Sequence, residues 1–418
     1  MNLVLLSDTG VVNGGAAKIA LGDAKLLAQA GHRVELLCGA GDAPGLKNLP
    51  NLTVHRVSDF DIAEDPNRLR AMATGWWNPQ AYKRMVELLS GLDPRDTIVH
   101  VHSWTKALSS SPIRAAWERG FSIVLTMHDF LVACPTGTLF LQHKQEKCHI
   151  KPMSLECMAT NCDVASYQHK VWRIGRRAIQ GVIGGVPSHI GHFIVYSQMA
   201  EDLMRPHLPA KAAVHHVPNV IDISPCEPTA VEENEEFAFL GRITPEKGVV
   251  LLARAAAAEN VPVRYVGEGP ERAAIEQANP QARFSGWLSH REGVETLRKS
   301  RALVFPSLWY ETLGLVVLEA AGNGVPSIVP DDCAARESVI DGVTGLHFRC
   351  GDEADLRRKI AILKDPEVAA RMGRAAYERF WNQPQHSAAF HTRRLEEVYL
   401  HMMAGHAAEA SAASLAVL

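Results

Sequence analysis

The sequence of 418 residues lacks the features that mark several classes of protein. No window approaches the roughly 18 unbroken apolar residues of a transmembrane helix. The start, MNLVLLSD, has no basic segment and only a short apolar run, whereas a secretory signal combines a basic start with a longer apolar stretch. Charge of neither sign dominates, since 43 Lys and Arg stand against 46 Asp and Glu. We therefore predict a cytoplasmic protein with no nucleic-acid partner.

Two short motifs are missing as well. Gly10, Gly14 and Gly15 do not have the GxGxxG spacing of a dinucleotide-binding turn, which argues against an NAD-dependent enzyme. None of the eight cysteines forms a CxxC pair, so the signature of a zinc ribbon is absent.

Two series of short apolar strands, separated by helical stretches, make up most of the chain. Residues 2–6 predict a buried strand, Gly14 and Gly15 a turn, residues 16–30 a helix that Gly31 ends, and residues 34–37 the next strand. Such a βαβ unit is typical of a parallel sheet. Further strands are predicted at residues 97–101, 122–126, 193–196, 237–241, 263–267, 282–286, 302–306 and 326–330.

The two series predict two doubly wound α/β domains. Residues 216–237 are rich in Pro, Asn, Asp and Glu and are interpreted as the connection between the domains. The predicted boundaries are 1–220 for the first domain and 221–385 for the second, with a C-terminal helix and a frayed end in 386–418. A helical stretch is predicted from residue 366 to about 403, with Asp365 as N-cap and Pro366 in the first position.

The segment PSLWYETLGLVVLEAAGNGVP carries Glu311 and Glu319, eight residues apart. On a helix this separation corresponds to a rise of about 12 Å and a rotation of about 80°, so the carboxylates would lie on nearby sides, two turns apart. The span is comparable to the reach from a ribose across a diphosphate to a sugar ring. The amides at the predicted helix start form a candidate anion site, namely those of Thr312, Leu313, Gly314 and Leu315. Two solvated surface glutamates are the alternative.

Upstream, the segment FAFLGRITPEKG carries Arg242 and Lys247. A nucleoside diphosphate is a poor leaving group unless its growing negative charge is neutralised, and two fixed cations with a helix N-terminus can do this without a metal. Arg suits bidentate contacts to phosphate, and Lys acts as a point charge. Taken alone, the two cations would also fit an ordinary solvated face.

In this order the two segments closely resemble the signature of family-four retaining glycosyltransferases, which have the GT-B fold of two Rossmann-like domains facing across a cleft. The resemblance implies that Glu311 contacts the donor sugar, that Glu319 binds the nucleotide ribose, and that Arg242 and Lys247 grip the diphosphate. It also implies that the acceptor attacks the face from which the diphosphate leaves, that the chemistry requires no cofactor, and that the last helix crosses back onto the first domain. It is specific from residue 237 to about 345 and diffuse in the first half.

Weaker similarities in the first half extend the predicted site. Gly14 and Gly15 fall where the family's glycine loop approaches the donor phosphates, and an ordinary turn is the alternative. His128 ends a strand in VLTMHDF, where a family histidine lies beside the donor sugar. His102, at the end of another strand in VHVHSW, is a second candidate on the acceptor side.

Two further turns match the family on the donor side. Gly267 lies in YVGEGPE, which resembles the family's turn after a strand. Asn219 lies in VPNVID, which resembles the family's hinge, although Val220 replaces the usual glycine.

A cysteine cluster lies in a predicted insert at about residues 130–165. Its members are Cys134, Cys148, Cys157 and Cys162. Three states are compatible with this spacing: a structural site for zinc or another metal, reduced buried thiols, or disulfides. The insert follows His128 and is therefore predicted to shape the acceptor pocket.

Basic and apolar residues alternate after this insert. The basic ones are Lys170, Arg173, Arg176 and Arg177. The pattern predicts either a solvated basic face or a helix that contacts anionic lipid.

We predict a retaining hexosyltransferase that moves a sugar from a UDP- or GDP-sugar to an acceptor hydroxyl in the synthesis of surface polysaccharide or lipid-linked glycan. Its partners would be the nucleotide sugar, a glycan or lipid-linked acceptor and, for a lipid-linked acceptor, the inner face of the membrane. Two alternatives stay open. One is a nucleotide-sugar epimerase or hydrolase on the same fold, and the other is a non-catalytic nucleotide-sugar-binding protein.

Overall fold

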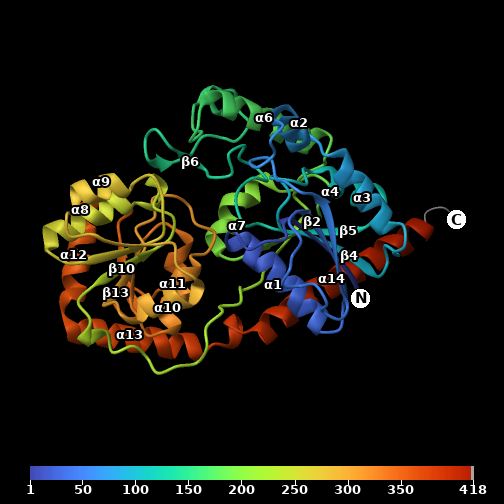
Figure 1. Cartoon of the computed structure of the whole chain (residues 1–418). Helices are drawn as coiled ribbons and strands as arrows, with labels where there is room; N and C mark the ends of the chain where they lie inside the picture. Colours follow the sequence, from blue (N-terminus) through green and yellow to red (C-terminus); the bar gives the residue numbers. More distant parts are fainter. Residues whose placement is uncertain (416–418) are drawn as a thin grey trace.

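Two α/β domains lie side by side in the structure, a computed structural model that describes the backbone of residues 1–415 and the side chains of residues 1–405 (Figure 1). The first domain is built on a parallel sheet with the strand order β3-β2-β1-β4-β5-β8-β9. Its strands are β1 (Asn2–Thr9), β2 (Arg33–Ala40), β3 (Leu52–Ser58), β4 (Thr97–Val101), β5 (Ser122–Thr126), β8 (His192–Val195) and β9 (Ala213–His216). Its helices include α1 (Gly15–Gln29), α2 (Arg68–Trp76), α3 (Pro79–Leu89), α4 (Ser111–Glu118), α6 (Tyr167–Val182) and α7 (Gln198–Met204).

The central strand β1 shows why this sheet is buried on both faces. Leu3 and Leu5 pack into one cluster of buried residues with α1, whereas Val4 and Leu6 pack into another with α3 and α4. Alternate side chains of a strand point to opposite faces, so a sheet covered on both sides needs an unbroken apolar strand. The short apolar run near the start of the sequence is such a strand.

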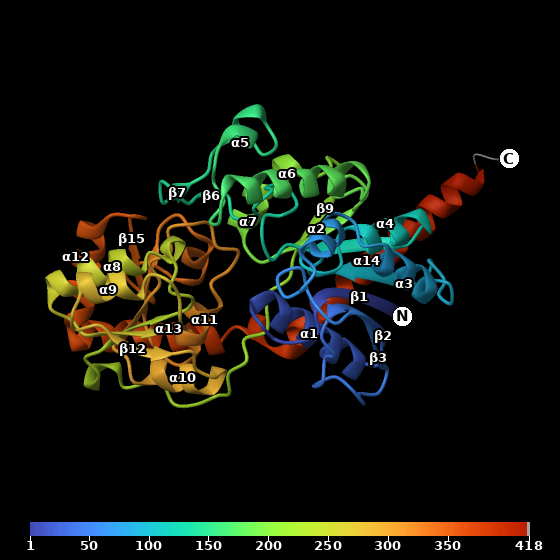
Figure 2. The same cartoon turned by 45° about the horizontal axis from the view of Figure 1, so that its top comes forward.

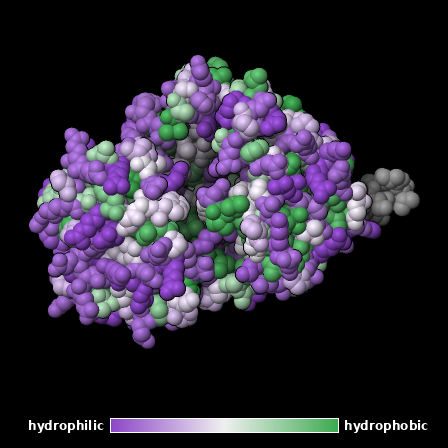
Figure 3. Space-filling view, viewed as in Figure 1, coloured by the Kyte–Doolittle hydropathy of each residue, from purple (hydrophilic) through white to green (hydrophobic). Residues whose placement is uncertain are grey.

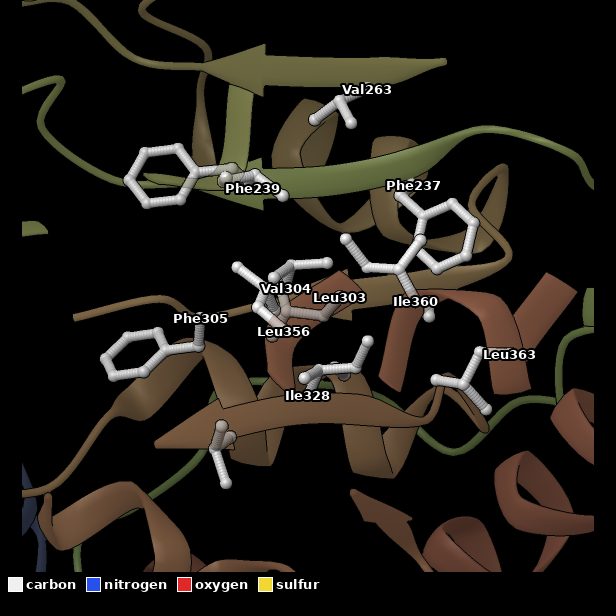
Figure 4. Close-up of a cluster of buried hydrophobic side chains, with 14 of the residues drawn as sticks. Phe237, Phe239, Val263, Leu303, Val304, Phe305, Ile328, Leu356, Ile360 and Leu363 are labelled. Atoms are coloured by element: carbon white, nitrogen blue, oxygen red, sulfur yellow. The ribbon is translucent and has the colours of Figure 1, made fainter. Parts of the chain in front are cut away.

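The second domain has a six-stranded parallel sheet with the order β12-β11-β10-β13-β14-β15. Its strands are β10 (Phe237–Leu240), β11 (Val263–Val266), β12 (Arg283–Gly286), β13 (Ala302–Val304), β14 (Ser327–Pro330) and β15 (Gly345–Phe348). Its helices are α8 (Val249–Glu259), α9 (Arg272–Ala278), α10 (His290–Arg298), α11 (Leu315–Gly322), α12 (Glu353–Lys364) and α13 (Pro366–Trp381). Leu356, Ile360 and Leu363 recur at helical spacing on α12 and point toward the sheet (Figure 4).

The C-terminal helix α14 (Ala388–Leu415) leaves the second domain and packs on the first (Figures 1 and 2). Its buried residues Leu395, Val398, Tyr399 and Met402 share a cluster with β1, β2 and α1. The predicted helical stretch from 366 to about 403 consists of two helices, because the short 3-10 helix Pro384–His386 separates α13 from α14, and α13 starts at Pro366 with Asp365 as N-cap, as predicted. The backbone is helical to Leu415, and the remainder of the predicted frayed end, residues 416–418, lies outside the described residues.

Every strand predicted from the sequence is present, but three strands of the two parallel sheets were missed, as were the two short strands of the insert described below. Strand β3 lies at the edge of its sheet and carries polar residues among its apolar ones, which hides the strand signal. Strands β9 and β15 are short edge strands. Among the described residues, no helix combines the length and the apolar character that crossing a membrane requires.

Candidate active site

The candidate site lies where the carboxyl ends of the strands of the second domain face the first domain across a hollow in the surface (Figure 3). Ligands of open α/β sheets collect at such strand ends. Gly241, Gly267 and Gly286 follow or end β10, β11 and β12, and all three have positive φ angles. A Cβ atom at Gly267 would lie 2.0 Å from the carbonyl oxygen of Gly241, so only glycine fits between these two turns.

A buried ion pair stands at this edge. Lys247 Nζ lies 2.7 Å from Glu311 Oε1, and Ser307 Oγ and Trp309 Nε1 each donate to the same oxygen over 2.6 Å. Burial alone would raise the pKa of Glu311, but the charge and hydrogen bond of Lys247 and the two other donors lower it below its ordinary value. Glu311 is therefore an anion, and its second oxygen takes no part in these three contacts.

Arg242 is close to this pair in sequence but sits differently. Its side chain is 60% exposed, and its guanidinium lies 3.5 Å from Glu246 Oε1. Gly248, directly after Lys247, has φ +65°, and a Cβ atom there would meet the carbonyl oxygen of Pro306 at 2.0 Å. The glycine thus lets the Lys247 turn pack against the loop that carries Glu311.

Helix α11 begins at Leu315, later than the sequence suggested. Gly314 is its N-cap, with φ +93°, so Thr312 and Leu313 belong to the preceding loop. The helical rise of about 12 Å therefore does not describe the separation of Glu311 from Glu319, because Glu311 lies outside the helix. The amides at the helix start still have no partner within the helix, which makes them available to an anion.

Glu319 lies on α11 beside two residues that sequence reasoning missed, His290 and Lys18. Its Oε1 is 3.6 Å from His290 Nδ1 and 4.0 Å from Lys18 Nζ, and Lys18 belongs to α1 of the first domain. Gly15, at the start of α1, is also close to α11, since a Cβ atom there would lie 3.7 Å from Leu315 Cδ1. The structure therefore brings the glycine turn, with Gly14 as N-cap of α1, opposite the start of α11.

His128 follows β5 and lies on the first-domain side of the same site. Its backbone carbonyl accepts from Thr312 Oγ1 at 3.4 Å, which joins it to the loop beside Glu311. Its ring Nε2 lies 3.2 Å from His102 Nδ1, and its Nδ1 lies 3.4 Å from the Tyr196 hydroxyl. Burial lowers the pKa of His128 to about 4, so its imidazole is neutral near pH 7.

A cavity of about 30 Å³ adjoins His128 and is lined by His102, Asp129 and Ala16 among others. Burial raises the pKa of Asp129 to about 6. Sequence reasoning assigned no role to Asp129, although it follows the same strand as His128.

Asn219 lies next to the predicted donor-side residues, because it lines the same cavity as Leu313. It is 2% exposed and lines a cavity of about 220 Å³ between the domains, together with Tyr196, Val317 and His386. This cavity lies on the face of α11 that meets the connection between the domains.

The cysteine-rich insert contains β6 (Phe140–Leu141), β7 (Glu146–Lys147) and α5 (Leu155–Ala159). All eight cysteines of the chain are free thiols, so the disulfide alternative is wrong. The buried Lys170 places Nζ 3.0 Å from Cys162 Sγ and 3.7 Å from Cys157 Sγ. Burial lowers the pKa of Lys170, but the neighbouring thiols outweigh it and raise the pKa.

This arrangement gives no support to a metal bound by Cys134, Cys148, Cys157 and Cys162. Within residues 1–405, no group of three or more His, Cys, Asp or Glu side chains is placed to hold a metal ion. The structure instead places an ammonium group between two of the thiols.

The basic residues of α6 do not form an exposed face, so the predicted solvated basic face is wrong, and these cations do not provide a surface for anionic lipid. Lys170 and Arg176 are 0% and 3% exposed. Arg176 donates to the carbonyl oxygens of Thr105 and Pro135, and Arg173 Nε lies 2.6 Å from Asp163. These side chains tie the insert to the first domain.

The insert also reaches the second domain beside Glu311. Lys147 Nζ lies 2.5 Å from Asp332 Oδ1 and donates to the Asp332 carbonyl oxygen over 2.7 Å. The same ammonium lies 4.8 Å from the ring centre of Tyr310. The insert therefore borders the site, and its position is fixed from both domains.

Comparison with known proteins agrees with this geometry. Residues 13–225 match the family model "Glycosyltransferase Family 4", and residues 222–379 match "Glycosyl transferases group 1". A glycogen synthase of Mycobacterium tuberculosis is 27% identical over 84% of this chain and 83% of its own length. A GDP-mannose-dependent alpha-mannosyltransferase of Mycolicibacterium smegmatis is 30% identical over 40% of this chain and 50% of its own.

Solved structures share the fold across almost the whole chain. Sucrose-phosphate synthase from Thermosynechococcus elongatus superposes with a TM-score of 0.71 at 19% identity, over 97% of this chain and 99% of that one. Anabaena HepE, in complex with UDP and glucose, gives a TM-score of 0.65 at 16% identity, over 96% and 100%. The predicted fold and family are confirmed: the chain has the GT-B fold and belongs to glycosyltransferase family 4.

Proposed function

We propose that this glycosyltransferase is a retaining enzyme that transfers a hexose from a UDP- or GDP-sugar to a hydroxyl of a glycan or lipid-linked acceptor. One observation carries the proposal: the Lys247–Glu311 pair lies beside the start of α11, and Thr312 joins this loop to His128 of the other domain. The pair supplies a cation for the leaving group and an anion for the sugar at one point of the cleft.

On the leaving-group side, Lys247, Arg242 and the start of α11 would share the charge of the diphosphate. Fixed cations and oriented amides stabilise charge as it develops, without reorganising during the reaction. Lys247 is held in place by Glu311, whereas the exposed Arg242, 3.5 Å from Glu246, would contact phosphate as a planar fork. No resident cofactor is needed for this step.

On the sugar side, the second carboxylate oxygen of Glu311 would accept from donor-sugar hydroxyls. The low pKa of this group keeps it an acceptor over the physiological pH range. The neutral ring of His128 would lie on the acceptor side, next to the small cavity with Asp129. An attack from the face that the diphosphate leaves would retain the anomeric configuration.

Glu319 would bind the ribose hydroxyls of the nucleotide, with His290 and Lys18 beside its carboxylate. Support for a nucleoside diphosphate comes from relatives: Anabaena HepE was solved with UDP, and the mannosyltransferase named above uses GDP-mannose.

A lipid-linked acceptor would bring the first domain to the inner face of a membrane. Leu69 on α2, Leu155 on α5 and Val182 on α6 are 80%, 86% and 84% exposed. These helices lie together at one end of the first domain, so this end is the proposed contact (Figure 2).

The test begins with thermal unfolding in the presence of UDP, GDP and ADP. One diphosphate should raise the midpoint of wild type by mass action and lose this effect in Glu319→Ala. Glu276→Ala, on an exposed face of α9, is the matched control and should keep the shift. Transfer from the matching nucleotide sugar, followed by NMR of the product's anomeric proton, then reads retention directly. An inverted product, or no response to any diphosphate, would refute the proposal.

A further inference from the structure

A buried ion pair joins the C-terminal helix α14 to helix α1 of the first domain. His391 of α14 and Asp23 of α1 are 2% and 4% exposed, and His391 Nε2 lies 2.8 Å from Asp23 Oδ1. The other ring nitrogen of His391 lies 2.7 Å from the carbonyl oxygen of Pro218. A carboxylate and a carbonyl only accept, so both ring nitrogens of His391 donate. His391 is therefore an imidazolium, and Asp23 is its carboxylate partner.

The second oxygen of Asp23 faces another histidine. Asp23 Oδ2 lies 3.7 Å from His102 Nε2, a buried atom for which the described residues provide no closer partner. Next to a carboxylate, the tautomer with a proton on the facing ring nitrogen is stabilised, whereas the tautomer with a lone pair there is repelled by the negative charge. His102 thus carries its proton on Nε2. Because burial lowers the pKa of His102 well below its ordinary value, the ring is neutral and its Nδ1 is a bare acceptor.

That acceptor determines the state of His128. The 3.2 Å contact between His102 Nδ1 and His128 Nε2 needs one donor, so the proton of His128 lies on Nε2. His128 Nδ1 is then a bare acceptor, and the Tyr196 hydroxyl donates to it over 3.4 Å. This last contact is long for a hydrogen bond to nitrogen, so a substrate hydroxyl can replace Tyr196 at low cost.

We propose that Asp23 and His102 are positioning residues that hold the proton of His128 on Nε2 and so present its Nδ1 as a hydrogen-bond acceptor at the reacting centre. The inference rests on the proposed function, because it assigns Nδ1 a substrate hydroxyl. It also gives α14 a part in the site: His391 balances the charge of Asp23, and without it Asp23 would be an unpaired buried anion.

The contacts from Asp23 through His102 to His128, called the relay below, have one more histidine beside them, His100, which has hydrogen-bond partners of its own. The ring of His100 packs against that of His102, with centres 4.0 Å apart and planes tilted by 34°, but its nitrogens lie 2.7 Å from the Tyr399 hydroxyl and 2.7 Å from Thr126 Oγ1. His100 therefore supports the packing of His102 and does not compete for its protons.

The test is Asp23→Asn, which keeps the size of the side chain but can turn an N–H toward His102. Every donor and acceptor along the relay would then invert, and the proton of His128 would move to Nδ1. Nitrogen-15 NMR of the histidine rings reads this directly, because protonated and bare ring nitrogens have distinct shifts. We expect His128 to be protonated on Nε2 in wild type and on Nδ1 in the variant. For transfer, we expect kcat to fall by roughly 100-fold or more while the KM for donor changes little, since a wrong tautomer removes an interaction used in the transition state.

Two further variants make the result unambiguous. His102→Phe keeps the stacked ring without its nitrogens and should also lower kcat, with the Asp23–His391 pair intact. His32→Gln removes a similar contact of α14, His32 Nε2 to Glu396 Oε1 at 2.8 Å, and should change neither kcat nor the His128 shifts. Wild-type His128 protonated on Nδ1 would overturn the inference, as would a normal kcat in Asp23→Asn. The NMR result needs no substrate, so it stands apart from any failure of the proposed transfer reaction.

Discussion

The Lys247–Glu311 pair offers the sharpest test of how the site is held together. At 2.7 Å and an effective dielectric constant of about 20, two unit charges attract each other by roughly 6 kcal/mol. Desolvation costs several kcal/mol per ion and offsets most of this attraction. The pair therefore adds little net stability, whereas removal of one partner leaves a mostly buried charge alone.

The perturbation is a double-mutant cycle of Lys247→Met and Glu311→Gln. Breaking a fully buried pair costs about 3–5 kcal/mol. The two side chains are 16% and 11% exposed, so we expect a loss of about 2–3 kcal/mol for each single variant. The double variant buries no unpaired charge and should lose less than the sum, with a coupling of about 1–2 kcal/mol. Urea unfolding of each variant gives these free energies.

The pH dependence of stability provides a second test of the same pair. The depressed pKa of Glu311 in wild type gives stability that is present above its unfolded value of 4.5 and is lost as pH falls. In Lys247→Met the lowering contributions of Lys247 vanish while burial remains, so the pKa of Glu311 should rise. The contribution of Glu311 should then favour the folded variant as pH falls, which is opposite in sign to its contribution in wild type.

The matched control is a pair at the other edge of the same sheet. Arg264 Nε lies 2.6 Å from Glu236 Oε2, with the two side chains 31% and 14% exposed. Arg264→Met should cost some stability and leave transfer unchanged, whereas Lys247→Met should lower transfer by at least about 100-fold. Strictly additive losses in the cycle, or full transfer by either single variant, would refute the role given to the pair.

Three other predictions follow from the buried groups and turns. Gly248→Ala should lower the free energy of unfolding by about 3 kcal/mol or more, because its Cβ atom would lie 2.0 Å from the Pro306 carbonyl oxygen. Gly342→Ala, with a similar φ and no neighbour within 4 Å, should lower it by about 1 kcal/mol, and urea unfolding measures both values. From pH 8 to pH 5 the free energy of unfolding should fall by about 2 kcal/mol for each of His100 and His128, because their folded pKa values of about 3 and about 4 lie below the unfolded value of 6.5. In His100→Gln this fall should be smaller by about 2 kcal/mol. Lys147→Ala should raise the proteolytic sensitivity of the insert and leave diphosphate binding intact, since Lys147 joins the insert to Asp332 but contacts no proposed phosphate group; an unchanged cleavage rate would contradict this.

Most of the second domain could be predicted because its signals are local. Strands β10, β11 and β12 are short runs that end at or directly before a glycine, and steric contact explains why Gly267 must be glycine. The contact of Lys247 with Glu311 joins distant residues, but each lies in a recognisable segment of its own. The start of α11 was misplaced, because Thr312 and Leu313 do not break a helix in sequence terms and only the φ of Gly314 shows where the loop ends.

The first domain is harder to predict because its site depends on tertiary contacts. Asp23 follows an Ala-rich stretch of α1 and looks like an ordinary surface acid, yet Ala20 and Leu27, three before and four after it, are both buried. A carboxylate on the apolar stripe of a helix is a signal that sequence reasoning could have used. The buried basic residues of α6 were misjudged for the same reason: periodicity shows which residues share a face but not whether that face is covered.

The C-terminal helix α14 shows why the two domains cannot be treated as separate units. The helix begins beside the second domain, but two of its residues bond to buried side chains in the first domain. Tyr399 is a hydrogen-bond partner of His100, and His391 is a hydrogen-bond partner of Asp23. Without α14, a buried imidazole nitrogen and a buried carboxylate would lose their partners, and each such loss costs about 1–3 kcal/mol or more. The helix also buries Leu395, Val398 and Met402 against β1 and α1. A motion that opened the cleft with the His391–Asp23 contact unbroken would bend the chain between α13 and α14, at the 3-10 turn of Pro384, and in the connection at residues 217–236.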